Sequence, residues 1–385
     1  MLPSSPTKPN QVTATSSPQI CPKVHTAKSH LRYSSAEASD FPIALLHLNP
    51  IVSMAANRWL AGTHAGLISI DGHDLFLSTT GPDRIPGTPV VILESGIGGS
   101  STSWPLVIRH LSPFVRIYIH DRAGLGKSEV NPFAQNRKPE AYAEKAAEDL
   151  DKLLQKAGVE GPFILIPMSW GGIVAREFLE RRNEDVVGMV MIECVQEKTT
   201  QINPIDAPNT MALLKGLDFF DVVGVHKRQR LTPAEWQAQM LEMAENGPQN
   251  AVERFAWPLT EQTLGKKKQF ERQLLGNRPI SIIKGNAARE YQQVYEAGVA
   301  AGNGTEEQRA IVSKMLEGMA EKEDMLQREQ LKLSSVSRFV QLEKPGHLVI
   351  LEEPEVIAAE VKWVMETSMK QRHEDPEDKR LGKQL

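Results

Sequence analysis

The chain has 385 residues, of which 41% are hydrophobic and 24% are charged, and 44 Lys and Arg against 48 Asp and Glu give a net charge of −4. These proportions are ordinary for a soluble globular protein, and the length allows one large domain or two modest ones. The near-balanced charge excludes a strongly basic nucleic-acid-binding surface. No run of 18 apolar residues is present, so we expect no membrane-spanning helix.

Residues 1–40 are rich in Ser, Thr and Pro and hold no acidic residue before Glu37, which predicts a disordered extension. The segment lacks the apolar core of a secretory signal. Its composition is also typical of a mitochondrial transit peptide, although Arg32 is its only arginine. Two cysteines, Cys21 and Cys194, cannot build a disulfide framework. We therefore expect a cytoplasmic protein, with the mitochondrion as the alternative.

Residues 41–65 form the most apolar early stretch, but Pro50 and Arg58 interrupt it. We interpret it as an N-terminal helical segment that packs on the domain rather than as a membrane anchor. At the other end, residues 368–385 are strongly charged and are expected to form a frayed tail.

From residue 66 on, short apolar runs alternate with helical patterns. A hairpin around Asp71-Gly72 is expected first. We expect its strands at 66–70 and 74–78, and further strands at 90–93, 115–119, 163–166, 186–192, 280–283 and 337–342. Most of these runs are apolar throughout, which predicts strands covered on both faces of a parallel sheet. Helical patterns such as 139–156 and 172–181 lie between them and favour an α/β fold with crossover connections.

Residues 197–278 break this rhythm because they are mostly helical in pattern. A helix start with Thr232 as its cap lies within them. An insertion of this size at the strand ends is expected to form a lid, or cap, over a site. A second helical stretch is expected from Thr305, with Gln308 as its capping-box partner, to about residue 333.

The strand at 163–166 runs directly into Pro167-Met168-Ser169-Trp170-Gly171-Gly172, and a helical pattern follows. A strand, a sharp turn with a serine at its tip and a helix expose the serine oxygen above the sheet, as in a nucleophile elbow. Small residues follow the serine because the helix must cross close to the strand. Pro167 departs from the G-x-S-x-G pattern, in which a glycine is expected there.

A second turn, Glu94-Ser95-Gly96-Ile97-Gly98-Gly99, follows the strand at 90–93. Its backbone N–H groups can face the serine and stabilise a tetrahedral oxyanion, and we expect Ile97 N–H and Trp170 N–H to be the donors. A phosphate-binding loop is the rival interpretation. No lysine follows in P-loop spacing, so a nucleotide site is disfavoured.

His347 stands in Lys344-Pro345-Gly346-His347, just past the last predicted strand. From there its ring can reach the serine, accept its proton and later protonate the leaving group. The ring needs a carboxylate to fix its tautomer. Glu193 ends the strand at 186–192, where an unpaired charge would be costly, and is the preferred candidate. Glu290 is the alternative acid, although its place past the strand at 280–283 makes it more easily a solvated surface residue.

On these residues, the chain over 66–367 resembles the α/β-hydrolase superfamily. The chain order of Ser169, acid and His347 is that of the family, and residues 121–128, Asp-Arg-Ala-Gly-Leu-Gly-Lys-Ser, are similar to its D-R-x-G-x-G-x-S segment. We interpret Asp121 and Arg122 as structural. The resemblance implies a mostly parallel central sheet flanked by helices, with a helical cap insertion. It also extends to fungal hydrolases, some of them in specialised-metabolite pathways. No Asp follows Gly285, where many members carry the acid.

The leading hypothesis is a serine hydrolase that cleaves an ester, lactone or thioester of a medium-sized apolar molecule through an acyl-enzyme on Ser169. The alternatives are an acyltransferase or cyclase with the same triad, and a non-catalytic ligand-binding protein. Haloalkane dehalogenases and epoxide hydrolases of this fold use an Asp nucleophile, so those reactions are disfavoured. Five cap aromatics either line an acyl pocket or form the core of the cap: Phe219, Phe220, Trp236, Phe255 and Trp257. No metal motif is visible, we expect no cofactor and no nucleic-acid partner, and the oligomeric state is open.

Overall fold

The computed structural model describes residues 57–132 and 138–374, which all belong to one compact unit. Eight strands form a single sheet. They are β1 (His64–Ile70), β2 (His73–Thr80), β3 (Val90–Glu94), β4 (Ile117–His120), β5 (Phe163–Pro167), β6 (Val186–Ile192), β7 (Ile280–Lys284) and β8 (Ser337–Gln341).

The strand order is β1-β2-β4-β3-β5-β6-β7-β8. β2 pairs antiparallel with β1 and with β4, and all other pairs are parallel. The chain moves from β3 to β4 in one direction and then returns past β3 to β5. The turns that follow β3 and β5 therefore leave neighbouring strands toward opposite faces. In open α/β sheets, ligands bind at such a reversal of the strand order.

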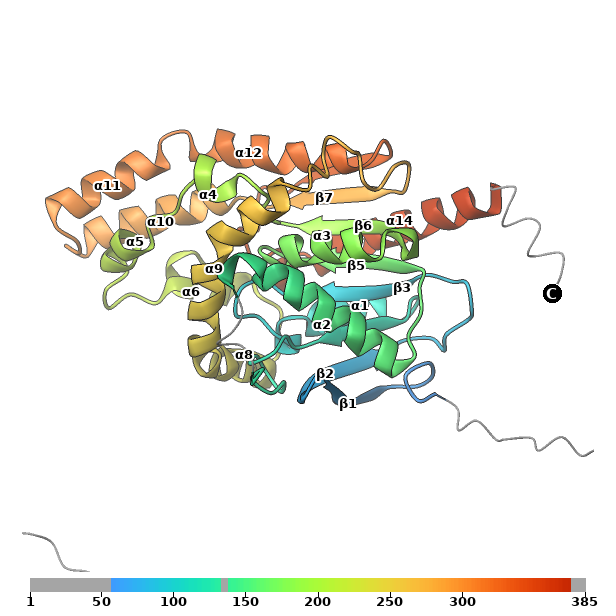
Figure 1. Ribbon diagram of the computed structural model, residues 1–385. Coiled ribbons are helices and arrows are strands. Elements are labelled where there is room, and N and C mark those ends of the chain that lie inside the picture. Colours follow the sequence, from blue (N-terminus) through green and yellow to red (C-terminus); the bar gives the residue numbers. More distant parts are fainter. Residues whose placement is uncertain (1–56, 133–137, 375–385) are drawn as a thin grey trace, which may run out of the picture. The chain divides into compact units, whose positions relative to one another are not determined.

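Helices cover both faces of the sheet (Figure 1). α2 (Tyr142–Ala157) and α3 (Gly171–Arg181) pack together on one face, and α1 (Pro105–Leu111) and α14 (Pro354–Glu374) pack together on the other. Successive strand residues alternate between the two cores: Val90 and Ile92 belong to the core with α2 and α3, and Val91 and Leu93 to the core with α1 and α14. This alternation explains why the central strands are apolar at every position.

The remaining helices gather at the end of the sheet where the parallel strands finish (Figure 1). Between β6 and β7 lie α4 (Thr199–Ile202), α5 (Ala207–Leu213), α6 (Phe219–Val222), α7 (Val225–Arg228), α8 (Pro233–Glu245) and α9 (Gly247–Gly265). Between β7 and β8 lie α10 (Ala287–Ala300), α11 (Glu306–Leu316) and α12 (Met319–Glu329), and α13 (Val349–Glu352) precedes α14. We call residues 197–278 the cap.

The predicted α/β architecture is confirmed, and the predicted strands lie within two residues of the observed ones. Both predicted capping boxes are present, at Thr232 and at Thr305. The stretch expected at 305–333 is divided into two helices by Gly318, which has a φ of 67°.

The two ends of the chain differ from the prediction where the structure describes them. The expected helical segment 41–65 is described only from residue 57, and it forms turns that lead into β1 rather than a helix. The expected tail 368–385 begins inside α14, which continues to Glu374. Residues 1–40 lie outside the described residues. Over the described ranges, no helix has the length and apolar character needed to span a bilayer.

Gly171 permits the close crossing of α3 over the turn after β3. A Cβ atom at this position would lie 2.6 Å from the backbone oxygens of Glu94 and Ser95. We expect Gly171→Ala to lower the free energy of unfolding by about 2 kcal/mol or more, because the backbone must move to relieve the overlap. Urea unfolding measures the change. Gly247→Ala, where no atom lies within 4 Å of an added Cβ, is the control and should change stability by less than ~1 kcal/mol. Equal losses in the two variants would contradict this explanation.

Candidate active site

Ser169 lies on a strained turn between β5 and α3. Its φ is 55°, a left-handed conformation that non-glycine residues rarely adopt. The turn is held on both sides: Ser169 N–H donates to Ile192 O at 3.0 Å, and Val195 N–H donates to Ser169 O at 3.1 Å. Pro167, which departs from the usual glycine, is the buried last residue of β5. The geometry of the turn is therefore that of a nucleophile elbow.

The turn after β3 lies directly against this serine. Glu94 pairs with Pro167 in the parallel register, and a Cβ atom on Gly96 would be 3.1 Å from Ser169 Cβ and 3.6 Å from Ser169 Oγ. A larger residue at Gly96 would therefore crowd the serine side chain. The amides of Ile97 and Trp170 belong to the two turns that meet here, and their action as oxyanion donors stays a prediction.

Glu193 and His347 meet at the same edge of the sheet. Glu193 follows β6 directly and, like Ser169, has a positive φ, of 50°. Its Oε1 accepts a hydrogen bond from Gly285 N–H at 2.6 Å, and its Oε2 lies 3.3 Å from His347 Nδ1. Glu193 is 7% exposed and the His347 side chain 38% exposed. The preferred acid thus contacts the predicted base, whereas the pairing of His347 with Ser169 stays a prediction.

Glu290 holds the backbone of the same histidine. Its Oε2 accepts a hydrogen bond from His347 N–H at 2.9 Å. The carboxyl group lies under the loop at Gly346, where a Cβ atom would be only 1.8 Å from Glu290 Cδ. The expectation of a solvated surface residue is wrong, since Glu290 is 4% exposed and burial raises its pKa.

The pKa of His347 is raised above its ordinary value of 6.5. Partial desolvation of the ring lowers it, but the hydrogen bond with Glu193 and the charges of Glu193, Glu290 and Glu323 outweigh that effect. Glu323, on α12, has its own pKa raised to about 7 by burial. These carboxylates therefore stabilise the imidazolium that forms when the neutral ring takes up a proton during the reaction.

Arg122, interpreted from the sequence as structural, forms a buried ionic cluster beside the turn after β3. It donates hydrogen bonds to Glu94 Oε1 at 2.6 Å and to Oε1 of Glu253, a residue of the cap, at 2.8 Å. His120 Nε2 lies 2.8 Å from the other oxygen of Glu94. Burial alone would lower the pKa of Arg122, but the charges of Glu253 and Glu94 raise it, so the guanidinium stays charged.

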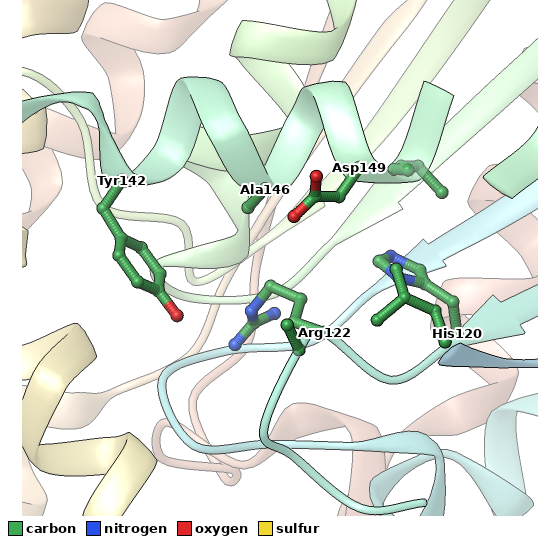
Figure 2. A pocket seen from close by; sticks show the side chains of 8 residues that line it. His120, Arg122, Tyr142, Ala146 and Asp149 are labelled. Carbon is green, nitrogen blue, oxygen red and sulfur yellow. The ribbon is translucent and has the colours of Figure 1, made fainter. Parts of the chain in front are cut away.

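A small cavity borders this cluster on the side of α2. Figure 2 shows Arg122 and His120 on one side of it and Tyr142, Ala146 and Asp149, all from α2, on the other. Its volume is about 10 Å³. Binding sites for small organic ligands measure roughly 300–1,000 Å³, so this cavity is no substrate pocket.

Three of the cap aromatics, Phe219, Phe220 and Trp236, pack on one another. The rings of Phe220 and Trp236 are 5.1 Å apart, and those of Phe219 and Phe220 are 5.5 Å apart. Phe255 is 70% exposed, and Trp257 donates a hydrogen bond to Glu261. The contacts of Phe220 and Trp236 match the alternative in which the aromatics form the core of the cap, whereas the exposed Phe255 does not.

A possible group of metal ligands lies on the cap surface among the described residues. Ligand atoms of Asp218, Asp221 and His226 lie within 4.8 Å of one another. Asp218 already has a structural role, because its carboxylate accepts a hydrogen bond from Asp221 N–H at the start of α6. We therefore assign this group to capping of the helix.

The central sheet, the serine turn and the histidine loop together define a protein of the α/β-hydrolase fold. Residues 90–360 match the alpha/beta hydrolase family, and the chain belongs to that family. The "AB hydrolase superfamily protein" of Gibberella zeae is 34% identical over 304 residues, which cover 76% of this chain and 91% of that protein. The "Probable transporter efuK" of Hormonema carpetanum is 34% identical over 305 residues, which cover 78% of this chain but only 42% of that longer protein.

Solved structures share the fold at low sequence identity. A putative lipase of Acinetobacter baumannii has a TM-score of 0.52 and 17% identity, with 82% of this chain and 95% of that chain covered. A haloalkane dehalogenase loop variant of Bradyrhizobium elkanii has a TM-score of 0.53 and 18% identity, with 81% of this chain and 100% of that chain covered. At such identities the likeness shows the fold alone.

The raised pKa of His347 predicts the pH dependence of the site. The neutral ring is the base, so the rate at which a fluorophosphonate modifies Ser169 should fall as the pH drops through a value above 6.5. In Glu193→Gln the carboxylate charge is lost, and the midpoint should move to lower pH. Intact-mass spectrometry at a series of pH values measures both profiles. Identical midpoints would show that Glu193 does not act on His347.

We expect substitution of Glu193 and of Glu290 to slow the modification of Ser169 to different extents. Glu193→Gln should slow modification at least about 10²-fold, because the ring loses the group that fixes its tautomer. Glu290→Gln keeps an oxygen that can accept His347 N–H and should cost less than about fivefold, or ~1 kcal/mol. The same labelling rates at pH 8 compare the two. A large loss in Glu290→Gln with a small one in Glu193→Gln would make Glu290 the acid.

Proposed function

We propose that this protein is a serine hydrolase that cleaves an ester, lactone or thioester of a medium-sized apolar molecule. Ser169 Oγ attacks the acyl carbon while His347 takes its proton, and His347 then gives that proton to the departing alcohol or thiol. Water, deprotonated by the same ring, releases the acid and frees the serine. Ile97 N–H and Trp170 N–H bind the oxyanion in both steps.

The observation that carries the proposal is the contact between Glu193 Oε2 and His347 Nδ1 at 3.3 Å, beside the strained serine turn. Ser169 and Glu193 follow neighbouring strands, and both have a positive φ. Strain of this kind persists where the surrounding structure fixes it and is concentrated at functional sites.

The apolar character of the substrate is supported by the loops around the site. Three of the loops that carry proposed site residues also carry a partly buried apolar side chain. These are Ile97 in the turn after β3, Val195 after Glu193, and Leu348 after His347. The 34% identity to proteins of Gibberella zeae and Hormonema carpetanum supports a relationship to fungal proteins. A role in fungal specialised metabolism is part of the proposal.

Labelling with a fluorophosphonate tests this function without knowledge of the substrate. We expect one adduct per chain in the wild-type protein and none in Ser169→Ala, because only an activated serine reacts. Ser128→Ala, which removes a loop hydroxyl bonded to Asp121 O, is the control and should keep the adduct. Intact-mass spectrometry provides the measurement. A folded wild-type protein without an adduct, or an adduct that persists in Ser169→Ala, would contradict the proposal.

A further inference from the structure

Glu253 on the cap helix α9 is fully buried and reaches the turn after β3. Its Oε2 accepts a hydrogen bond from Gly98 N–H at 2.7 Å. Its two oxygens also accept hydrogen bonds from Arg122 Nε at 2.8 Å and Arg122 Nη2 at 2.9 Å. At 0% exposure, burial of this side chain without such partners would be costly.

Arg122 binds two backbone carbonyl groups of the same turn. Its Nη1 donates to Ser95 O at 2.7 Å, and its Nη2 donates to Gly96 O at 2.6 Å. A trans peptide is planar, and its C=O and N–H point in opposite directions. Because Gly96 O is fixed toward Arg122, the N–H of Ile97 in the same peptide must point away from Arg122. Gly96 itself lies against Ser169.

We propose that Glu253 is a positioning residue that sets the direction of the Ile97 N–H through Arg122 and Gly98. This inference rests on the proposed function, because Ile97 N–H is the oxyanion donor in that mechanism. Glu253 does not touch the substrate. It fixes the two peptides on either side of Ile97, one through Gly96 O and the other through Gly98 N–H.

The same region of the cap contacts the turn at one further point and also contacts two neighbouring segments. Asn246 Nδ2 donates to Gly98 O at 3.0 Å, and Asn246 Oδ1 accepts from Gly126 N–H at 3.0 Å. Thr102 Oγ1 donates to Glu242 Oε1 at 2.9 Å. The junction of α8 and α9 is therefore tied by hydrogen bonds to the segments that follow β3 and β4.

The test compares Glu253→Gln with Glu261→Gln in the full chain. Glu261 lies on the same helix and is 1% exposed, but its partners are Thr200 and Trp257 rather than the turn. In Glu253→Gln we expect the maximal rate of fluorophosphonate modification to fall about 10²-fold, since a misplaced donor costs about that much. The concentration of reagent for half-maximal rate should change little. Glu261→Gln should label like the wild type.

Amide hydrogen exchange over residues 94–102 provides a readout that needs no catalysis. Exchange should become faster in Glu253→Gln and stay unchanged in Glu261→Gln. If Glu253→Gln does not fold, Glu253→Asp, which keeps the charge but shortens the side chain, should give a smaller loss in the same direction. Wild-type rates in both assays, or equal losses in both glutamine variants, would overturn the inference. If the wild-type protein takes no label, the proposed function fails, and the exchange result still decides whether Glu253 holds the turn.

Discussion

The left-handed conformation of Ser169 is the constraint on which the site depends. A non-glycine residue in this region costs about 1–2 kcal/mol, so the neighbouring structure must hold it. Ile192 O and Val195 N–H bind the two sides of the serine peptide, and Gly171 lets α3 cross close to the turn after β3. The buried parallel strands supply this rigidity, because their carboxyl ends are fixed in register by the sheet.

Three buried carboxylates around this serine have different roles. Glu193 contacts the ring of His347 and Glu290 its backbone N–H, so one residue adjusts the chemistry of the base and the other its position. On the opposite side, Glu253 and Arg122 hold the turn after β3. Each carboxylate is buried together with a donor, which offsets the cost of removing its charge from water. The site is thus built from buried carboxylates whose hydrogen-bond donors come from distant parts of the chain.

Local patterns predict much of this. Unbroken apolar runs gave the strands of the parallel sheet, and a serine between a strand and a helix gave the turn at Ser169. Glu193 can be predicted as the acid from the sequence, because it directly ends an apolar strand. The burial of Glu290 cannot be predicted in this way, since it depends on the loop at Gly346. The partners of Glu253 cannot either, because Gly98 and Arg122 lie 155 and 131 residues away in the sequence. One pattern indicates that Glu253 has a buried partner. It shares the buried face of α9 with Ala256, Thr260 and Leu264, and a charge on such a face requires a partner.

The most direct test of the account is a crystal structure of the protein after reaction with a fluorophosphonate, because the phosphoryl oxygen stands in for the oxyanion. We expect the phosphorus on Ser169 Oγ and the phosphoryl oxygen within about 3.1 Å of Ile97 N and Trp170 N, with the ring of His347 between Ser169 and Glu193. A phosphoryl oxygen turned to solvent, or phosphorus on another side chain, would contradict the central claim that these strand-end turns form the catalytic centre.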